Sequence, residues 1–376
     1  MMPITQIPRR ASCLPLALLA LAASACKATE PAPTAKETPT ASSAAVVPKE
    51  QTPPADGATS ATVRVLTADA TKLQRPTTAA FRGQALFVSI GQLSALFGKD
   101  QKPNLPFSAL SVSRETGTFN SESVALPGDD YYPEGIAAAP DGTLYIGSIV
   151  QATIMKVPAT STSAEPFLKK GVARRGVLGL TVDEPRKLLW FCDTGPKLPD
   201  EKKAGELVGV KLSDGTEVVR HALPPQDGKP PFCNDVIAGP DGTLWITESA
   251  SGRLFRVPAA AALEANSASV WLAGGEIGAS EKGFGANGVE WVDGKLIVAN
   301  VGRGTLVELD PKSEAPDRGA HTLTLVDEKT RAPMPLCSPD GVELVPGSKN
   351  AVVIVENGGC DSKTPRLVEV TLAARQ

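Results

Sequence analysis

The sequence predicts an all-β fold, a six-bladed β-propeller formed by residues 62–376, in which an N-terminal strand closes the last blade. Three observations predict this fold. Short apolar strands recur in units of about 50 residues, Asp-Gly turns join neighbouring strands in several units, and the last unit lacks a strand that the start of the body can supply. A β-sandwich is the alternative, but it would not require a repeat of this length.

The repeat is clearest in five units, each of which begins with a short strand, a turn and a second strand. Turns such as Asp141-Gly142 and Asp241-Gly242 supply residues that tolerate the positive φ of a tight hairpin. A third apolar run follows each hairpin, and a fourth is visible in most units, for example at residues 218–221 and 321–324. Four antiparallel strands per unit predict a propeller blade.

A weaker sixth unit precedes these five, with its second and third strands at residues 85–89 and 108–112. The last unit ends at its third strand, whereas the apolar run at residues 63–66 belongs to no unit. We therefore expect residues 63–68 to pair with residues 367–372, because a closed ring leaves no exposed strand edge.

Residues 1–25 have the layout of a secretory signal, in which Arg9 and Arg10 precede an apolar run too short to span a bilayer. The small residues before Cys26 also resemble a bacterial lipobox, although Ala23 stands where that motif usually has Leu. Lipidation of Cys26 would give an exported lipoprotein of the cell envelope, on the periplasmic or outer-membrane face, bound to the membrane through its lipid anchor only. Plain cleavage after Ala25 is the alternative.

Residues 26–61 are rich in Ala, Pro, Thr, Ser and Lys, with no large aromatic residue and no apolar periodicity. Such a segment cannot bury enough apolar surface to order itself, so it is predicted to be a disordered tether. The formal net charge of the chain is −3 at pH 7, which gives a nucleic-acid partner no electrostatic support. We expect a monomer.

Four cysteines lie in the body of the chain, and none forms a CxxC motif. An even number of cysteines in an exported chain favours disulfides over metal ligation. The second strand of a blade ends on the same face of the propeller on which the first strands begin. A cysteine at the end of a second strand can therefore reach a cysteine at the start of a first strand, in the same blade for Cys360 and Cys337 and in the next blade for Cys192 and Cys233. The predicted disulfides are Cys192–Cys233 and Cys337–Cys360.

The innermost strands of a propeller begin around a central channel, so the first position of each unit converges on one point. These positions are Glu134, Leu178, Asn234, Asn287 and Asp340, with a Thr such as Thr78 in the first unit. Two carboxylates and two amide carbonyls are hard oxygen donors, which predicts Ca²⁺ or another hard divalent cation. The alternative is that Asn and Asp are turn formers here, but this does not explain Glu134.

The cyclic order Glu, apolar, Asn, Asn, Asp resembles the SMP-30/gluconolactonase/LRE family of calcium-dependent lactonases, with a looser similarity to paraoxonases. The resemblance implies that Glu134, Asn287 and Asp340 bind the metal, that Asn234 binds the metal or contacts the substrate, and that Asp340 is also the catalytic base. Asn234 is taken here as the fourth metal ligand. Phe232 and Asp235 are expected to line the substrate pocket. Phe232 stands where gluconolactonase-like members often have Arg, which favours a less polar lactone or ester than a sugar acid.

The leading hypothesis is therefore a calcium-dependent hydrolase of a small lactone or ester. A non-catalytic propeller that binds a cell-envelope component or a protein partner is the alternative, because propellers host both. A lyase of the virginiamycin B lyase type is a third possibility, suggested by a similar string at residues 133–142. Such enzymes rely on a histidine, and both His221 and His321 are predicted to lie in outermost strands.

Overall fold

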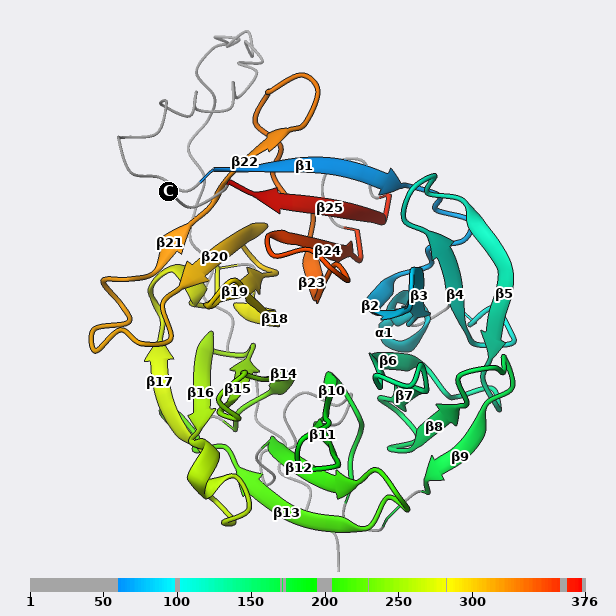
Figure 1. Cartoon of the computed structure of the whole chain (residues 1–376), viewed down its shortest axis with the longest axis horizontal. Helices are drawn as coiled ribbons and strands as arrows, with labels where there is room; N and C mark the ends of the chain where they lie inside the picture. Colours follow the sequence, from blue (N-terminus) through cyan, green and yellow to red (C-terminus); the bar gives the residue numbers. More distant parts are fainter. Residues whose placement is uncertain are drawn as a thin grey trace, which may run out of the picture. The chain divides into compact units, whose positions relative to one another are not determined.

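The computed structural model describes residues 60–98, 102–169, 171, 174–194, 205–228, 230–281, 283–358 and 364–373, all within the unit Pro53–Gln376. Six sheets, whose strands are antiparallel except for one parallel pair in the last sheet, form a ring around a central channel, as predicted (Figure 1). Each sheet begins with its innermost strand at the channel and proceeds outward. We number them blades 1 to 6 in chain order.

Blades 1 to 3 each contain four strands in sequence order. Blade 1 contains β2 (Pro76–Arg82), β3 (Ala85–Ile90), β4 (Ser108–Ser113) and β5 (Phe119–Ala125), and the short helix α1 (Leu93–Phe97) follows β3. Blade 2 contains β6 (Pro133–Ala138), β7 (Leu144–Ser148), β8 (Ile154–Val157) and β9 (Glu165–Leu168). Blade 3 contains β10 (Leu180–Asp183), β11 (Leu188–Asp193), β12 (Glu206–Lys211) and β13 (Glu217–Ala222).

Blades 4 and 5 repeat this order, and blade 6 has an additional strand. Blade 4 contains β14 (Cys233–Ala238), β15 (Leu244–Glu248), β16 (Arg253–Val257) and β17 (Ser269–Ala273), and the 3-10 turns η1 (Ala259–Ala261) and η2 (Gly275–Ile277) flank β17. Blade 5 contains β18 (Ala286–Val292), β19 (Lys295–Asn300), β20 (Thr305–Leu309) and β21 (His321–Thr322). Blade 6 contains β23 (Pro339–Leu344), β24 (Ala351–Glu356), β25 (Arg366–Leu372), β1 (Ser60–Thr67) and β22 (Thr324–Asp327).

The N-terminal strand β1 closes the ring in blade 6, which confirms the predicted closure. It pairs antiparallel with β25, from Ala61 opposite Leu372 to Thr67 opposite Leu367. Its other edge pairs parallel with β22, which the sequence did not predict. The run at residues 321–324 was expected to form one outer strand of blade 5, but only β21 remains there and the chain then crosses to blade 6.

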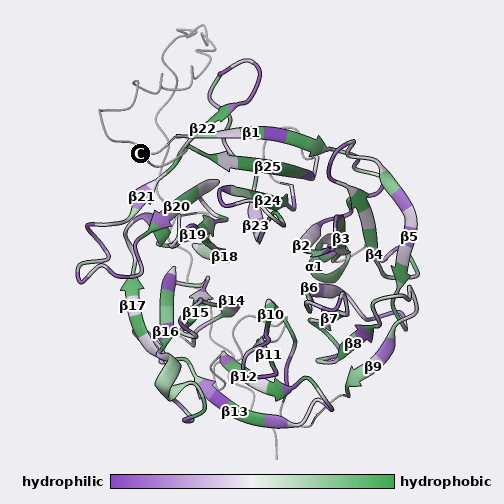
Figure 2. Ribbon diagram, viewed as in Figure 1, coloured by the Kyte–Doolittle hydropathy of each residue, from purple (hydrophilic) through white to green (hydrophobic). Residues whose placement is uncertain are grey.

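The second strands form the most buried layer of the blades, because sheets pack against them on both faces. Every residue of β7, β11, β15 and β24 is buried. The outer strands are only partly covered, and β5 buries a single side chain, Val124. Figure 2 shows the same arrangement, with hydrophobic residues along most strands and hydrophilic residues concentrated in the connecting loops.

An irregularity at the start of the innermost strands sets the direction of their side chains. In β2, β6, β14, β18 and β23 the pairing register shifts between the first and fourth residues, so each strand contains one extra residue there. A β-bulge of this kind turns a side chain away from its regular direction. The second residue of these strands therefore faces the channel.

In β6, β18 and β23 the third residue is a glycine that lies against the backbone of the next blade. A Cβ added to Gly135 would lie 2.2 Å from the carbonyl oxygen of Leu178, and one added to Gly288 would lie 2.2 Å from the carbonyl oxygen of Asp340. Only glycine fits at such separations. The close approach of the innermost strands at these glycines leaves no room for a side chain between the neighbouring blades.

Deletion of residues 27–67, which removes β1, is expected to lower the free energy of unfolding by several kcal/mol. The deletion exposes the edge of β25 and removes the buried side chains of Ala61 and Val63. Deletion of residues 27–58 leaves β1 intact and serves as the control. Urea unfolding of both variants measures the effect, and equal stabilities would contradict the closure account.

Candidate metal and hydrolase site

The bulged starts of the innermost strands bring the predicted polar residues together at the channel. Glu134, Asn234, Asn287 and Asp340 each occupy the second position of their strand, and their exposed fractions are 5%, 8%, 7% and 4%. Leu178 occupies the corresponding place in blade 3 and is buried. Burial of four polar side chains in one ring is costly unless partners compensate for the lost water.

The residue that corresponds to this ring in blade 1 is Thr77, not Thr78. Pro76 pairs with Ile90, as Pro133 pairs with Ser148, so the second position of β2 is residue 77. Both threonine hydroxyls donate to the carbonyl oxygen of Glu134, at 2.8 Å from Thr77 and 2.6 Å from Thr78. These two threonines therefore hold the backbone of Glu134 rather than extend the acidic ring.

The hydrogen bonds of the ring leave some of its oxygens unpartnered. Asn357 Nδ2 donates to Asp340 Oδ2 at 3.0 Å, and the side chain of Asn287 donates to the same carboxylate. In contrast, Glu134 Oε2 and Asn287 Oδ1 are buried and have no hydrogen-bond partner among the described residues. Buried acceptors of this kind cost free energy unless a cation, a proton or water satisfies them.

Burial and like charge shift the acid dissociation of the two carboxylates. Burial, with a smaller contribution from the charge of neighbouring Asp235, raises the pKa of Asp340 to about 7, against the lowering effect of the Asn357 hydrogen bond. Burial raises the pKa of Glu134 well above its usual range, and the charges of Asp340 and Asp235 add to this effect. No cationic side chain contributes to either shift, so no positive charge of the protein stabilises the ionised form of these two carboxyl groups.

The donor set of this ring fits a hard cation. Across the described residues, no three His, Cys, Asp or Glu side chains lie close enough to hold a metal by themselves. A cation here would therefore need the amide oxygens of Asn234 and Asn287 in addition to the two carboxylates. Carboxylate and amide oxygens are the ligands that Ca²⁺ prefers, with water completing its coordination.

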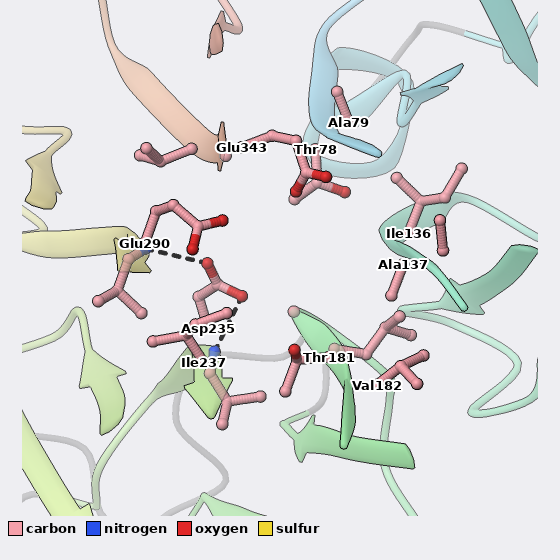
Figure 3. A pocket seen from close by; sticks show the side chains of 17 residues that line it. Thr78, Ala79, Ile136, Ala137, Thr181, Val182, Asp235, Ile237, Glu290 and Glu343 are labelled. Carbon is pink, nitrogen blue, oxygen red and sulfur yellow. Dashed lines mark hydrogen bonds between the residues drawn. The ribbon is translucent and has the colours of Figure 1, made fainter. Parts of the chain in front are cut away.

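A second tier of carboxylates lies below this ring, in a cavity of about 160 Å³. Asp235, Glu290 and Glu343 come from three consecutive blades, and none of the described residues that line the cavity is Lys, Arg or His. Figure 3 shows the Asp235 and Glu290 side chains pointing into this cavity, with Thr78 and Thr181 among its other polar residues.

Each second-tier carboxylate accepts a backbone N–H from the next blade. Asp235 Oδ2 accepts from Val289 at 3.0 Å, Glu290 Oε2 from Leu344 at 3.3 Å, and Glu343 Oε1 from Phe81 at 3.3 Å. Because these bonds join blade 4 to 5, 5 to 6 and 6 to 1, the second tier links the blades. Glu290 and Glu343 were not among the predicted site residues, although both follow a Gly-Val pair in the matching strings at residues 287–290 and 340–343.

A disulfide and a buried ion pair hold the backbone of the residues just before Asn234. Cys192 of blade 3 is bonded to Cys233 of blade 4, as predicted, with the two Cα atoms 5.3 Å apart. Glu248 accepts the Phe232 N–H at 3.1 Å and pairs with Arg253 at 2.9 Å. The centroid of the Phe232 ring lies 5.5 Å from the centroid of the Phe284 ring. Phe232 precedes Asn234 in the chain and Phe284 precedes Asn287, so the two rings meet close to the starts of β14 and β18.

The other cysteines, the N-terminal segments and the histidines were also the subject of predictions. Cys337 is disulfide-bonded, whereas Cys360 and Cys26 lie outside the described residues, as do the predicted signal segment and nearly all of the tether. Both histidines of the chain lie in outermost strands, as predicted, His221 buried in β13 and His321 exposed in β21. No described helix has the length and apolar character needed to cross a bilayer.

Comparison with known proteins supports the resemblance to SMP-30/gluconolactonase-like propellers. The model of the N-terminal part of strictosidine synthase-like proteins matches residues 120–149, which include Glu134. Regucalcin from Agrobacterium tumefaciens strain C58, described as a calcium-binding protein, has 15% identity and a TM-score of 0.55, over 83% of this chain and 95% of that chain. A putative gluconolactonase has 13% identity and a TM-score of 0.55, over 84% of this chain and 93% of that one.

The chain is also similar in fold to virginiamycin B lyase from Staphylococcus aureus. A catalytically inactive His-to-Ala variant of that lyase, solved with quinupristin, has 11% identity and a TM-score of 0.51, over 83% of this chain and 100% of the lyase. No curated protein matches this chain in sequence. At these identities the solved structures establish a shared fold and nothing finer.

Replacement of Glu290 by Gln is expected to change how stability depends on pH. Burial raises the pKa of Glu290 to about 7, so the folded state binds its proton more tightly than the unfolded chain does. The stabilisation that tighter proton binding gives the folded state is fully present below the ordinary pKa of Glu and is lost as the pH rises through 7. Between pH 5 and 8 the stability of E290Q relative to the unmodified chain should rise by on the order of 2 kcal/mol.

Urea unfolding at several pH values measures this difference. The exposed Glu165 on β9 has no such environment, so Glu165→Gln should leave the pH profile unchanged. Identical pH profiles for E290Q and E165Q would show that Glu290 titrates as an ordinary surface carboxylate.

Proposed function

We propose that this chain is a calcium-dependent hydrolase of a lactone or ester at the cell envelope. The observation that carries the proposal is the pair of buried, unpartnered oxygens, Glu134 Oε2 and Asn287 Oδ1, beside the carboxylate of Asp340. Hydrogen bonds from the protein do not satisfy these oxygens, and a hard divalent cation would. The fold shared with regucalcin and a putative gluconolactonase is consistent with this reading.

Glu134, Asn234, Asn287 and Asp340 would hold the cation. When bound, Ca²⁺ supplies positive charge that polarises a carbonyl and favours the oxyanion formed during hydrolysis. The chain's own contribution is a rigid frame. The two threonines of blade 1 hold the backbone of Glu134, the Cys192–Cys233 disulfide holds the backbone before Asn234, and two amides orient Asp340.

Asp340 is the candidate base. Its carboxylate would take a proton from water while the water oxygen bonds to the carbonyl carbon of the substrate. The bond from that carbon to the ring or ester oxygen then breaks, and the leaving oxygen receives the proton. The products are a carboxylic acid and an alcohol, joined in one molecule when the substrate is a lactone.

The rim of the site favours a substrate with an apolar portion. Phe232 and Phe284 are half-buried with tilted rings 5.5 Å apart, and Phe232 stands where gluconolactonase-like proteins often have an Arg that holds a polar substrate. Asp235 uses both oxygens on backbone N–H groups, Oδ1 on Val236 and Oδ2 on Val289, which fixes its side chain at the floor of the pocket. We therefore propose a small lactone or ester that is less polar than a sugar lactone.

Specific features distinguish the proposed hydrolase from two other functions, a histidine-dependent lyase and a non-catalytic binding propeller. A lyase that relies on histidine has no candidate at the channel, because His221 bonds with Ala262 and Ser267 and His321 lies on the rim of blade 5. A non-catalytic binding propeller would retain the cation but show no turnover. Lipidation of Cys26 would place the protein at the cell envelope under either function.

Asp340→Asn is expected to reduce hydrolysis of aryl esters and lactones by at least about a hundredfold at saturating Ca²⁺, because the variant removes the proposed base and nearly preserves shape. The control is Asp214→Asn, in an exposed turn of blade 3, which should retain full activity. Initial rates with excess Ca²⁺ and with EDTA measure the effect. Wild-type hydrolysis that is unaffected by EDTA, or undiminished activity in D340N, would contradict the proposed mechanism.

A further inference from the structure

A second cavity lies at the junction of blades 6 and 1, on the face where the first strands begin. Its volume is about 290 Å³, larger than that of the channel cavity. Its described lining residues come from the β1–β2, β3–β4 and β24–β25 connections, and Arg75, Lys102 and Asn104 among them are exposed. Its principal lining residues are Leu73, Arg75, Gln92, Lys102, Asn104 and Pro365.

The charge of this cavity is opposite to that of the channel. Arg75 and Lys102 are its charged lining residues, and no carboxylate is among the described residues that line it. Arg75 is held in place by donation from Nε to Ser94 Oγ at 2.9 Å and from Nη1 to the carbonyl oxygens of Asn357 and Gly358. Within the described part of the chain, Arg75 Nη2 and Lys102 Nζ have no hydrogen-bond or ion-pair partner, so both can donate to a ligand.

A closed set of amide hydrogen bonds makes the cavity rigid. Gln92 Oε1 accepts the Asn104 N–H at 2.6 Å, and Gln92 Nε2 donates to the Asn104 carbonyl oxygen at 2.8 Å. Asn104 Nδ2 donates to Gln74 Oε1 at 2.7 Å, which joins the β3–β4 loop to the β1–β2 loop. A preformed site loses less entropy when a ligand binds than a site that must become ordered.

The remaining lining is apolar. Ala70, Leu73, Ala95 and Pro365 line it, of which Leu73 and Pro365 are buried whereas Ala70 and Ala95 keep accessible apolar surface. An apolar floor with two cationic groups suits a ligand that has a short hydrocarbon body and one anionic end. Arg and Lys donors form their strongest hydrogen bonds with carboxylates and phosphates.

The cavity is connected to the candidate site by two hydrogen bonds. Arg75 donates to the carbonyl oxygen of Asn357 at 3.3 Å, and Asn357 Nδ2 donates to Asp340 Oδ2 at 3.0 Å. An anionic group held here would lie beside the channel but away from its buried carboxylates, which would otherwise repel it. The position is suitable for the second end of a bifunctional substrate, or for an acid product.

We propose that this cavity binds the carboxylate of a small aliphatic acid through Arg75 and Lys102. The bound acid would be an arm of the substrate or a product only if the protein is a hydrolase, so this role rests on the proposed function. The binding itself does not rest on it, because it follows from the charges, rigidity and lining of the cavity alone.

Isothermal titration of the full chain with hexanoate tests the proposal, with neutral hexanamide as the matched probe. Hexanoate should bind saturably, more weakly at 0.5 M NaCl than at about 0.05 M, and hexanamide should bind at least about tenfold more weakly. Lys102→Gln and Arg75→Gln should each weaken hexanoate binding by about tenfold or more. Lys211→Gln, on an exposed end of β12, should leave it unchanged.

Lys102 has no partner among the described residues, so K102Q should fold normally and thermal unfolding can verify this. Absence of hexanoate binding, or equal binding by the unmodified chain and K102Q, would overturn the proposal even if ester hydrolysis is observed. Binding that is lost in K102Q would support the pocket even if no hydrolysis is found, so the two proposals can fail separately.

Discussion

The extra residue at the start of the innermost strands is the constraint on which the rest of this structure depends. Five of these strands contain it, and it directs the second side chain of each toward the channel. In β6, β18 and β23 the third residue then meets the backbone of the next blade at distances that admit only glycine, as at Gly135 and Gly288. One local irregularity, repeated around the ring, therefore both assembles the site and sets the contacts between blades.

The bulge has an electrostatic consequence, because it gathers five carboxylates where no described cationic side chain can pair with them. The two tiers differ in how their buried carboxylate oxygens are satisfied. In the lower tier, Asp235, Glu290 and Glu343 accept backbone N–H groups from the neighbouring blade, so their burial contributes to the joining of blades. In the upper ring, Glu134 and Asn287 retain oxygens with no partner. Unsatisfied acceptors in a preformed ring are typical of a ligand site rather than of a structural network.

Much of this arrangement could be predicted from the sequence because a propeller repeats one unit. The missing strand in the last unit predicted closure by β1, and the spacing of the units brought Glu134, Asn234, Asn287 and Asp340 to one ring. The cysteines at the matching face gave the Cys192–Cys233 disulfide. These predictions depend on the order of units, which the sequence records directly.

The features that could not be predicted depend on register and on long loops. A one-residue bulge decides whether Thr77 or Thr78 occupies the ring, and adjacent threonines give no signal for it. The departure of β22 from blade 5 depends on an edge that exists only after β1 has closed the ring. Asn357 follows β24 and touches Asp340 only through the fold. Such contacts arise from tertiary packing, and local sequence patterns do not encode them.

The central claim is that the upper ring is a site for one hard divalent cation. Calorimetric titration of the EDTA-treated full chain with Ca²⁺ tests it most directly, with Glu134→Gln as the variant, because it removes one anionic ligand while it keeps the size of the side chain. The account predicts one bound Ca²⁺ per chain and binding weakened by at least about tenfold in E134Q. No heat of Ca²⁺ binding to the unmodified chain, or equal binding by E134Q, would contradict it.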